Sequence, residues 1–145
     1  MGSAVAIGAV LALLTAGCAQ EPAALPPACG DGPEAVRDAL ARAPGDVRLY
    51  DGTLLSDCVR RASTDAELQM VGLALTPVAD ELSLQETRTA ATRLGFLVGA
   101  ARRGGDESNG VHIELVRRLE SRVRFEDPAL LEAAERAARA GEEHG

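Results

Sequence analysis

The apolar and polar positions along most of the chain follow the period of an amphipathic helix. Apolar residues recur at intervals of three and four, and no segment alternates with the two-residue period of a half-buried strand. The clearest stripe is formed by Leu68, Val71, Leu75, Val78 and Leu82. We therefore predict an all-α fold, a small irregular bundle of four to five helices.

Capping residues, prolines and glycines mark where helices are expected to begin and end. Thr64 and Glu67 have the spacing of a capping box, in which the first side chain caps a helix and the second reaches back to it. Ser83 and Glu86 repeat this spacing. Pro77 interrupts the stripe, and because the stripe continues past it we expect one kinked helix. The helical segments are expected at residues 33–43, 56–62, 64–82, 83–103, 108–123 and 127–140.

The segment 46–55 has the weakest helical pattern. Its apolar residues are consistent with a short extended piece that leads into a turn at Asp51-Gly52. An aspartate followed by glycine and threonine also suggests phosphotransfer chemistry, but Asp-Gly is a common turn pair. We expect a turn here.

Two glycines lie one turn apart in the segment 83–103. Gly95 and Gly99 have a spacing that lets helices dimerise in membranes, but Arg88, Arg93 and Arg102 belong to the same segment. We expect the glycines to permit close packing against another helix of the same domain.

The beginning of the chain has the pattern of an export signal. Residues 4–14 are an uninterrupted apolar run, too short to span a bilayer comfortably. The following Leu14-Thr15-Ala16-Gly17-Cys18 resembles the lipobox of bacterial lipoproteins. That resemblance implies cleavage after Gly17, diacylglyceryl transfer to Cys18 and N-acylation. A secretory signal that is cleaved elsewhere and an uncleaved anchor are the alternatives.

A proline-rich stretch separates Cys18 from the helical segments. Three prolines fall within residues 19–28, which favours an extended tether of about 3 Å per residue. We therefore divide the chain into a cleaved signal peptide (1–17), a lipidated cysteine with its tether (18–28), a helical domain (29–140) and a disordered tail (141–145).

Composition limits the partners and the type of core. The net charge of −7 opposes binding to nucleic acid and to anionic lipid surfaces. With one Tyr, two Phe and no Trp, the core must be packed by aliphatic side chains. All basic residues are Arg, and Ala and Gly are abundant, so the mature part resembles lipoproteins of high-GC, actinobacterial bacteria.

The two remaining cysteines are expected to form a structural disulfide. Cys29 and Cys58 would close a loop of about 29 residues, which stabilises a fold by roughly 3–4 kcal/mol in the chain-entropy model. An even cysteine pair in an exported protein is usually bonded. A catalytic thiol is disfavoured because the chain has no C-x-x-C pair and no histidine near either cysteine.

The chain offers few residues for catalysis or for a cofactor. His112 falls on the apolar stripe of the segment 108–123, where a buried histidine with one hydrogen-bond partner is expected. Metal-ligand clusters, phosphate loops and nucleophile motifs are absent from the sequence. We therefore predict a protein without a cofactor.

These observations favour a non-enzymatic function at the cell envelope. We expect a lipoprotein held on the membrane by Cys18, facing the periplasm or the outside, that acts as a binding or scaffolding module for an envelope protein. The alternative is a small-ligand carrier or cryptic enzyme with a pocket near His112. Exposure of His112 to a concave site would favour that alternative, and burial among apolar side chains would oppose it.

Overall fold

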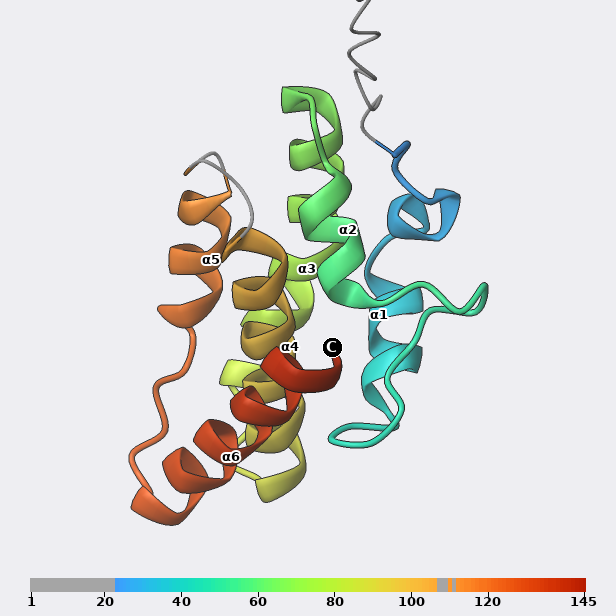
Figure 1. The fold of residues 1–145 in the computed structure, drawn as a ribbon. Coiled ribbons are helices and arrows are strands. Elements are labelled where there is room, and N and C mark those ends of the chain that lie inside the picture. Colours follow the sequence, from blue (N-terminus) through green and yellow to red (C-terminus); the bar gives the residue numbers. More distant parts are fainter. Residues whose placement is uncertain (1–22, 107–109, 111) are drawn as a thin grey trace, which may run out of the picture.

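The computed structural model describes residues 23–106, 110 and 112–145, and the secondary structure within these ranges is entirely helical. The elements are η1 (Pro27–Gly30), α1 (Pro33–Leu40), α2 (Leu55–Arg61), α3 (Asp65–Ser83), α4 (Arg88–Asp106), α5 (Ile113–Glu120) and α6 (Pro128–His144), shown in Figure 1. The all-α prediction is confirmed. The described residues contain six α-helices, one at each of the six expected helical segments, rather than the four to five of the predicted bundle.

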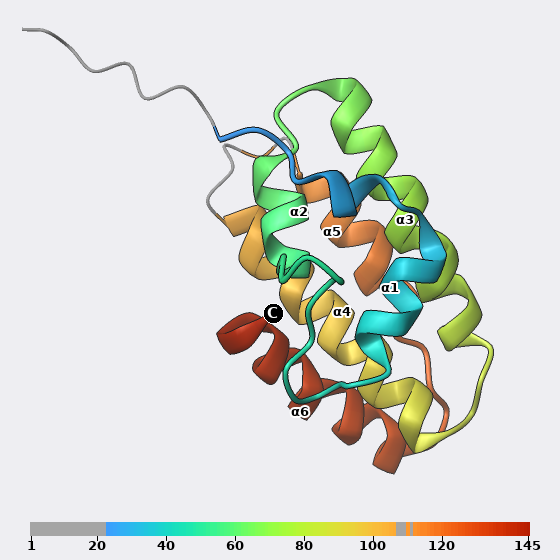
Figure 2. The same cartoon turned by 90° about the vertical axis from the view of Figure 1, so that its right-hand side faces the viewer.

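Helix α4 runs through the middle of the bundle (Figures 1 and 2) and contacts all five other α-helices. Leu94, Phe96 and Leu97 are completely buried along it. Burial of this kind explains why α4 carries small and apolar residues around most of its circumference.

The closest packing in the bundle is between α4 and α6. A Cβ atom added to Gly95 would lie 2.0 Å from the carbonyl oxygen of Ala134, and one added to Gly99 would lie 1.9 Å from that of Ala138. Any side chain at either glycine would therefore collide with the backbone of α6. The expected close packing of these glycines against a neighbouring helix is confirmed.

The start of α3 has the predicted capping box. The amide of Glu67 donates to Thr64 Oγ1 (3.2 Å), and the amide of Thr64 donates to Glu67 Oε2 (3.0 Å). Hydrogen bonds from the amide and hydroxyl of Ser63, together with those from Thr64, lower the pKa of Glu67. The helix then continues without a break past Pro77, so the expectation of one helix is confirmed.

The predicted start of α4 at Ser83 is wrong. Ser83 is the last residue of α3, and its hydroxyl donates to the carbonyl oxygen of Asp80 (2.7 Å). The actual cap is Thr87, whose Oγ1 accepts from the amide of Ala90 (3.2 Å). Serine and threonine both suit a cap, and α3 continues to Ser83 because its buried stripe extends to Leu82.

The helix expected at 56–62 begins one residue earlier, so Ser56 is not the cap that its position before the predicted helix would suggest. Helix α2 begins at Leu55, and Ser56 lies inside it, 4% exposed. The Ser56 hydroxyl donates to the carbonyl oxygen of Gly145. This serine therefore joins α2 to the last turn of α6 instead of capping its own helix.

Two predicted helix ends are wrong for the same reason. Helix α4 continues past Gly104 to Asp106, and α6 continues past Gly141 to His144. A Cβ atom on Gly104 would lie 2.4 Å from the carbonyl oxygen of Ser56, and one on Gly141 would lie 2.3 Å from that of Phe96. These glycines allow close helix packing and do not terminate the helices. The segment 141–145, expected to be a disordered tail, is therefore packed against α4.

The folded domain begins earlier than predicted. Ala28 is 2% exposed within η1, and Leu25 packs against the core, so the last residues of the expected tether belong to the domain. Cys29 in η1 and Cys58 in α2 form the predicted disulfide, with their Cα atoms 5.4 Å apart. This bond fixes the beginning of the domain to the bundle.

Helix α5 is shorter than the expected helix at 108–123. It covers Ile113–Glu120 and buries Leu115 and Leu119. Residues 107–109 and 111 lie outside the described part of the chain. The C-terminal end comes early because Ser121 caps the helix, and Arg122 then pairs with Asp80 of α3.

Candidate binding groove

A groove runs between α3 and α5, which contact each other along one side of the bundle. Its volume is about 500 Å³, within the range of sites that hold small ligands or the side chains of a partner. The groove is lined by Asp65, Leu68, Gln69, Gly72, Leu73, Thr76, Pro77, Glu114, Leu115 and Arg118. We call this surface the α3–α5 groove.

The floor of the groove is apolar. Gly72 has no side chain to fill the space between the helices, and a Cβ atom there would meet only Leu115 Cδ1, at 3.9 Å. Leu115 is 6% exposed and closes the floor from the α5 side. The hydroxyl of Thr76 is shielded from solvent and has no hydrogen-bond partner among the described residues. A buried hydroxyl without a hydrogen-bond partner costs free energy.

The rim of the groove on α3 is unusually apolar for a helix surface. Leu73, which lines the groove, is 64% exposed, and Met70, which lies outside the groove next to Gly30 of η1, is 43% exposed. No charged residue occurs from residue 68 to residue 79, so the exposed face of this half of α3 is uncharged. An exposed apolar surface of this kind commonly marks an interaction site.

Charged side chains stand at the edges of the groove. Asp65 lies in the first turn of α3, and Glu114 lies in the first turn of α5. Glu114 pairs with Arg118 at 3.7 Å and with Arg117 at 3.6 Å. The groove is therefore apolar at its centre, with acidic and basic groups one helical turn apart along its α5 edge.

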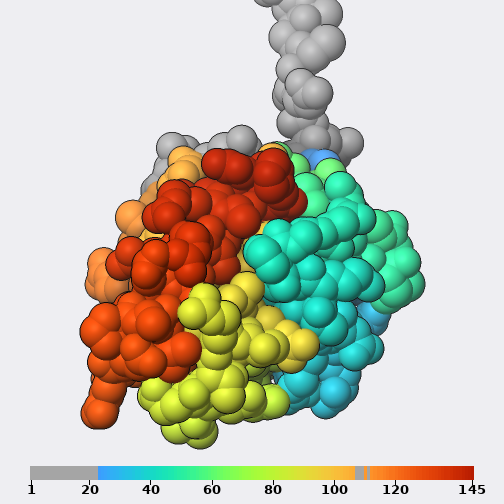
Figure 3. Space-filling model, turned by 90° about the horizontal axis from the view of Figure 1, so that it is seen from below, coloured from blue at the N-terminus to red at the C-terminus, as the bar shows by residue number. Residues whose placement is uncertain are grey.

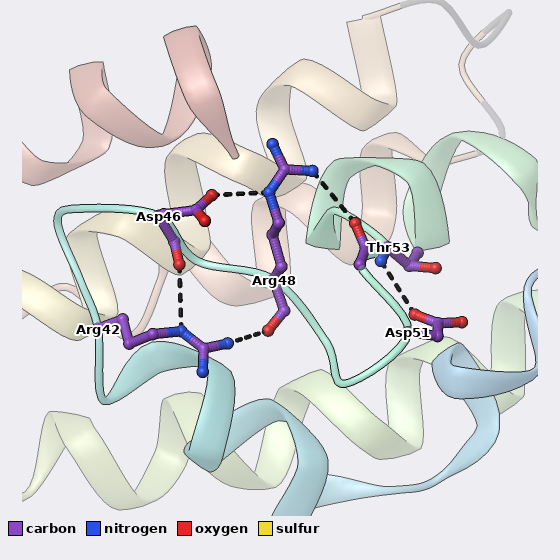
Figure 4. A network of polar contacts seen from close by, with 6 residues as sticks. Arg42, Asp46, Arg48, Asp51 and Thr53 are labelled. Atoms are coloured by element: carbon purple, nitrogen blue, oxygen red, sulfur yellow. Dashed lines mark hydrogen bonds and ion pairs between the residues drawn. The ribbon is translucent and has the colours of Figure 1, made fainter.

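A second polar feature is the loop between α1 and α2, whose shape is held by arginines (Figure 4). Arg42 donates to the carbonyl oxygens of Asp46 and Arg48, and Arg48 pairs with the Asp46 carboxylate at 2.6 Å. The amide of Thr53 donates to Asp51 (2.9 Å), and bonds from the Thr53 hydroxyl and amide lower the pKa of Asp51. This confirms the turn expected at Asp51-Gly52, where Gly52 has a φ of 88°.

The same loop borders a charged pocket of about 530 Å³ at the last turn of α6. Figure 3 shows the loop and the end of α6 side by side. Arg48, Arg103 and His144 approach it together with Asp46 and Glu143. Arg103 is engaged, since it donates to the carbonyl oxygen of Glu143 at 2.6 Å. Because acidic and basic groups alternate around this pocket, it has no consistent charge preference, and we do not take it as the functional site.

His112 lies in the interior of the domain. It is 5% exposed, and its Nε2 is 2.8 Å from the carbonyl oxygen of Ala62 at the end of α2. Because a carbonyl only accepts, Nε2 carries the proton, and Nδ1 has no partner among the described residues. This is the buried histidine with one partner that the sequence predicts. A ligand cannot reach this side chain from solvent in this conformation.

The predicted residues do not gather into one site. Cys29 and Cys58 are bonded to each other, and His112 contacts the end of α2. Cys18, the predicted lipidation site, lies outside the described residues, as do residues 1–17. The α3–α5 groove contains none of the residues singled out in the sequence as candidates for chemistry.

The described residues show neither a metal cluster nor a membrane-spanning helix. Within those ranges no three His, Cys, Asp or Glu side chains are close enough to hold a metal ion. Nor does any helix in the same ranges combine the length and the hydropathy required to cross a bilayer. Comparison of the chain with protein-family models, with curated proteins and with solved structures finds no match in any of the three.

Sequence reasoning missed the groove although a pattern for it is present. The leucines and valines of α3 belong to its inward-facing stripe, except Leu73, which lies on the outer face and is exposed. An exposed leucine inside a long uncharged stretch of helix is typical of an interaction surface.

Proposed function

We propose that this protein is a lipid-anchored component of the bacterial cell envelope that acts as a non-enzymatic binding module. In this proposal the chain is cleaved after Gly17 and acylated on Cys18, and it faces the periplasm or the outside of the cell. The lipobox-like sequence at residues 14–18 supports the anchor. The Cys29–Cys58 disulfide supports an oxidising compartment, because structural disulfides are rare in the cytosol.

The observation that carries the binding role is the exposed apolar face of α3 beside the α3–α5 groove. Leu73 is 64% exposed next to a hollow that no side chain of the described residues fills. Covering such a surface removes apolar area from water, which is the main favourable term in most protein association. The groove brings no paired general acid and base together over a pocket floor, and this supports binding over catalysis.

The beginning of the domain fits display on a tether. The chain joins the bundle through Leu25 and η1, and the disulfide holds η1 firmly against α2 (Figure 2). The residues between Cys18 and Leu25 would span roughly 20 Å when extended. A pull on the lipid anchor would therefore act on a cross-linked part of the fold.

The anchor is tested by comparing wild type with Cys18→Ser in fractionated cells. We expect wild type in the membrane fraction, released only by detergent, and Cys18→Ser in the soluble fraction, because acyl chains supply the membrane affinity. Ala19→Ser is the matched control and should remain with the membrane. The protein should be detected with an antiserum, because Gly145 is buried and a tag there would disturb α6. Membrane retention of Cys18→Ser would contradict the lipid anchor.

A further inference from the structure

We infer that Met70 is an oxidation site of the folded domain, and that its oxidation by a peroxide loosens η1 from α3 and makes the Cys29–Cys58 disulfide accessible to thiols. The inference goes beyond the proposed binding role and depends neither on that role nor on the lipid anchor. Three observations support it: the exposure of the Met70 thioether, its contact with Gly30, and the position of Gly30 directly after Cys29.

The Met70 side chain lies partly in solvent and partly against η1. It is 43% exposed, so a small oxidant can reach it in the folded protein. It is also the one methionine among the residues that the structure describes, because Met1 lies outside them. Methionine oxidation within this part of the chain is therefore confined to a single position.

The sulfur of Met70 packs directly on the backbone of η1. A Cβ atom added to Gly30 would lie 2.9 Å from Met70 Sδ, so the thioether occupies the space that a side chain at residue 30 would need. Of the α-helices, α3 is the one that η1 contacts most extensively (Figure 2). The apolar contact of Met70 with Gly30 therefore helps to hold η1 in place.

The element η1 has little stability of its own. It is a single turn of four residues, and a 3-10 turn this short depends on tertiary contacts for its position. Cys29 within it is 3% exposed and Cys58 is 2% exposed, so a thiol cannot reach their bond unless η1 moves away from the bundle. The rate of disulfide reduction consequently reports how often η1 opens.

Oxidation changes the chemistry of the contact between Met70 and Gly30. The thioether sulfur attacks one oxygen of hydrogen peroxide, an S–O bond forms and the O–O bond breaks. The departing hydroxide takes the proton of the transferred oxygen and leaves as water, so the sulfur gives up two electrons and the peroxide accepts them. The product is a sulfoxide, which is polar and larger than the thioether and fits poorly against Gly30. We expect η1 to open more often as a result.

Peptide mass spectrometry tests the site of oxidation. We would treat the purified full chain carrying Cys18→Ser with hydrogen peroxide, because this variant has no thiol outside the Cys29–Cys58 disulfide. The peptide that contains Met70 should gain one oxygen atom while circular dichroism shows that the protein remains folded. Failure of Met70 to gain oxygen, under conditions that oxidise it in the unfolded chain, would overturn the inference.

Disulfide reduction tests the consequence of oxidation. After the peroxide is removed, dithiothreitol is added without denaturant, and the thiols that appear are titrated over time. The oxidised protein should be reduced severalfold faster than the untreated protein. Met70→Leu keeps an apolar side chain of similar size against Gly30 and has no sulfur to oxidise, so peroxide should leave its reduction rate unchanged. Equal rates for the oxidised and untreated protein that carries Met70 would also overturn the inference.

A transplanted methionine separates this contact from oxidation in general. Leu84 directly follows α3, is 84% exposed, and lies about 20 Å further along the helix than Met70. In the double variant Met70→Leu, Leu84→Met, peroxide should oxidise the introduced methionine and leave the rate of disulfide reduction unchanged. If oxidation at position 84 accelerates reduction as much as oxidation at Met70, the contact with Gly30 is not responsible and the inference is wrong. An unchanged rate there, together with faster reduction of the protein oxidised at Met70, would support it.

Discussion

The glycines inside the helices of this protein are explained by the atoms that an added Cβ would contact. Gly95, Gly99, Gly104 and Gly141 all lie inside helices, where glycine costs about 1 kcal/mol relative to alanine. They are retained at that cost because a Cβ atom at any of them would collide with a backbone oxygen of a neighbouring helix. In contrast, Gly72 faces the open groove.

This contrast gives a paired prediction. Gly99→Ala should lower the free energy of unfolding by at least about 2 kcal/mol, since the new Cβ atom would force α4 and α6 apart. Gly72→Ala should raise it by about 0.5–1 kcal/mol, because the residue gains helix propensity and meets only an ordinary contact. Urea denaturation followed by circular dichroism measures both. Equal effects at the two positions would contradict the close packing of α4 on α6.

The carboxylate of Glu67 should make part of the stability depend on pH. Its pKa is lowered in the folded state by bonds from Ser63 and Thr64, so its contribution is present above the ordinary glutamate pKa and is lost as the pH falls through the folded value. Wild type should therefore exceed Glu67→Gln in stability at neutral pH, and the difference should shrink in acid. Denaturation of both proteins between neutral and acidic pH measures this.

The matched control is Glu86→Gln, which removes the same charge from the connection between α3 and α4. Its stability difference from wild type should change less with pH than that of Glu67→Gln. A difference that grows in acid for Glu67→Gln would show that the capping box is not formed as described.

Among the secondary-structure elements, sequence patterns predicted existence and type better than ends. The starts of α3 and α6 were correctly predicted because Thr64 and Asp127 cap through local hydrogen bonds that the sequence alone determines. The ends of α4 and α6 were predicted too early, because the roles of Gly104 and Gly141 depend on contacts with residues that are distant along the chain. A glycine that follows an apolar stripe has the same local sequence pattern whether it ends its helix or allows a second helix to pack closely against it.

The disulfide makes η1 and α2 one unit. A Cys29→Ser, Cys58→Ser double variant should lose roughly 3–4 kcal/mol of unfolding free energy, because the unfolded chain regains the freedom of the loop that the bond closes. Denaturation of wild type with and without reductant provides the same comparison without mutation. A loss below about 1 kcal/mol would mean that α1 and the loop to α2 are already ordered in the unfolded ensemble.

The molecule as a whole is organised around α4, and this level was the least accessible from sequence. The stripes of α3 and α4 predict which faces are buried, but they do not say which helices pack together. The α3–α5 groove was missed for that reason. It forms where Gly72 of α3 faces Leu115 of α5, and these two residues are far apart in the sequence. The Cys29–Cys58 pair was an exception, since these are the two cysteines that remain once Cys18 is assigned to the predicted anchor.

The last turn of α6 gives the sharpest test of this arrangement. Gly141 packs on Phe96 and Gly145 on Ala100, and Ser56 donates to Gly145, so residues 141–145 bring α6, α4 and α2 together. Deleting them should lower the free energy of unfolding by about 1–3 kcal/mol, because buried parts of α4 become exposed. Glu143→Gln, which keeps the backbone, should have little effect. Thermal unfolding of both variants would decide between a packed and a disordered segment: if the deletion is as stable as wild type, these five residues do not close the bundle.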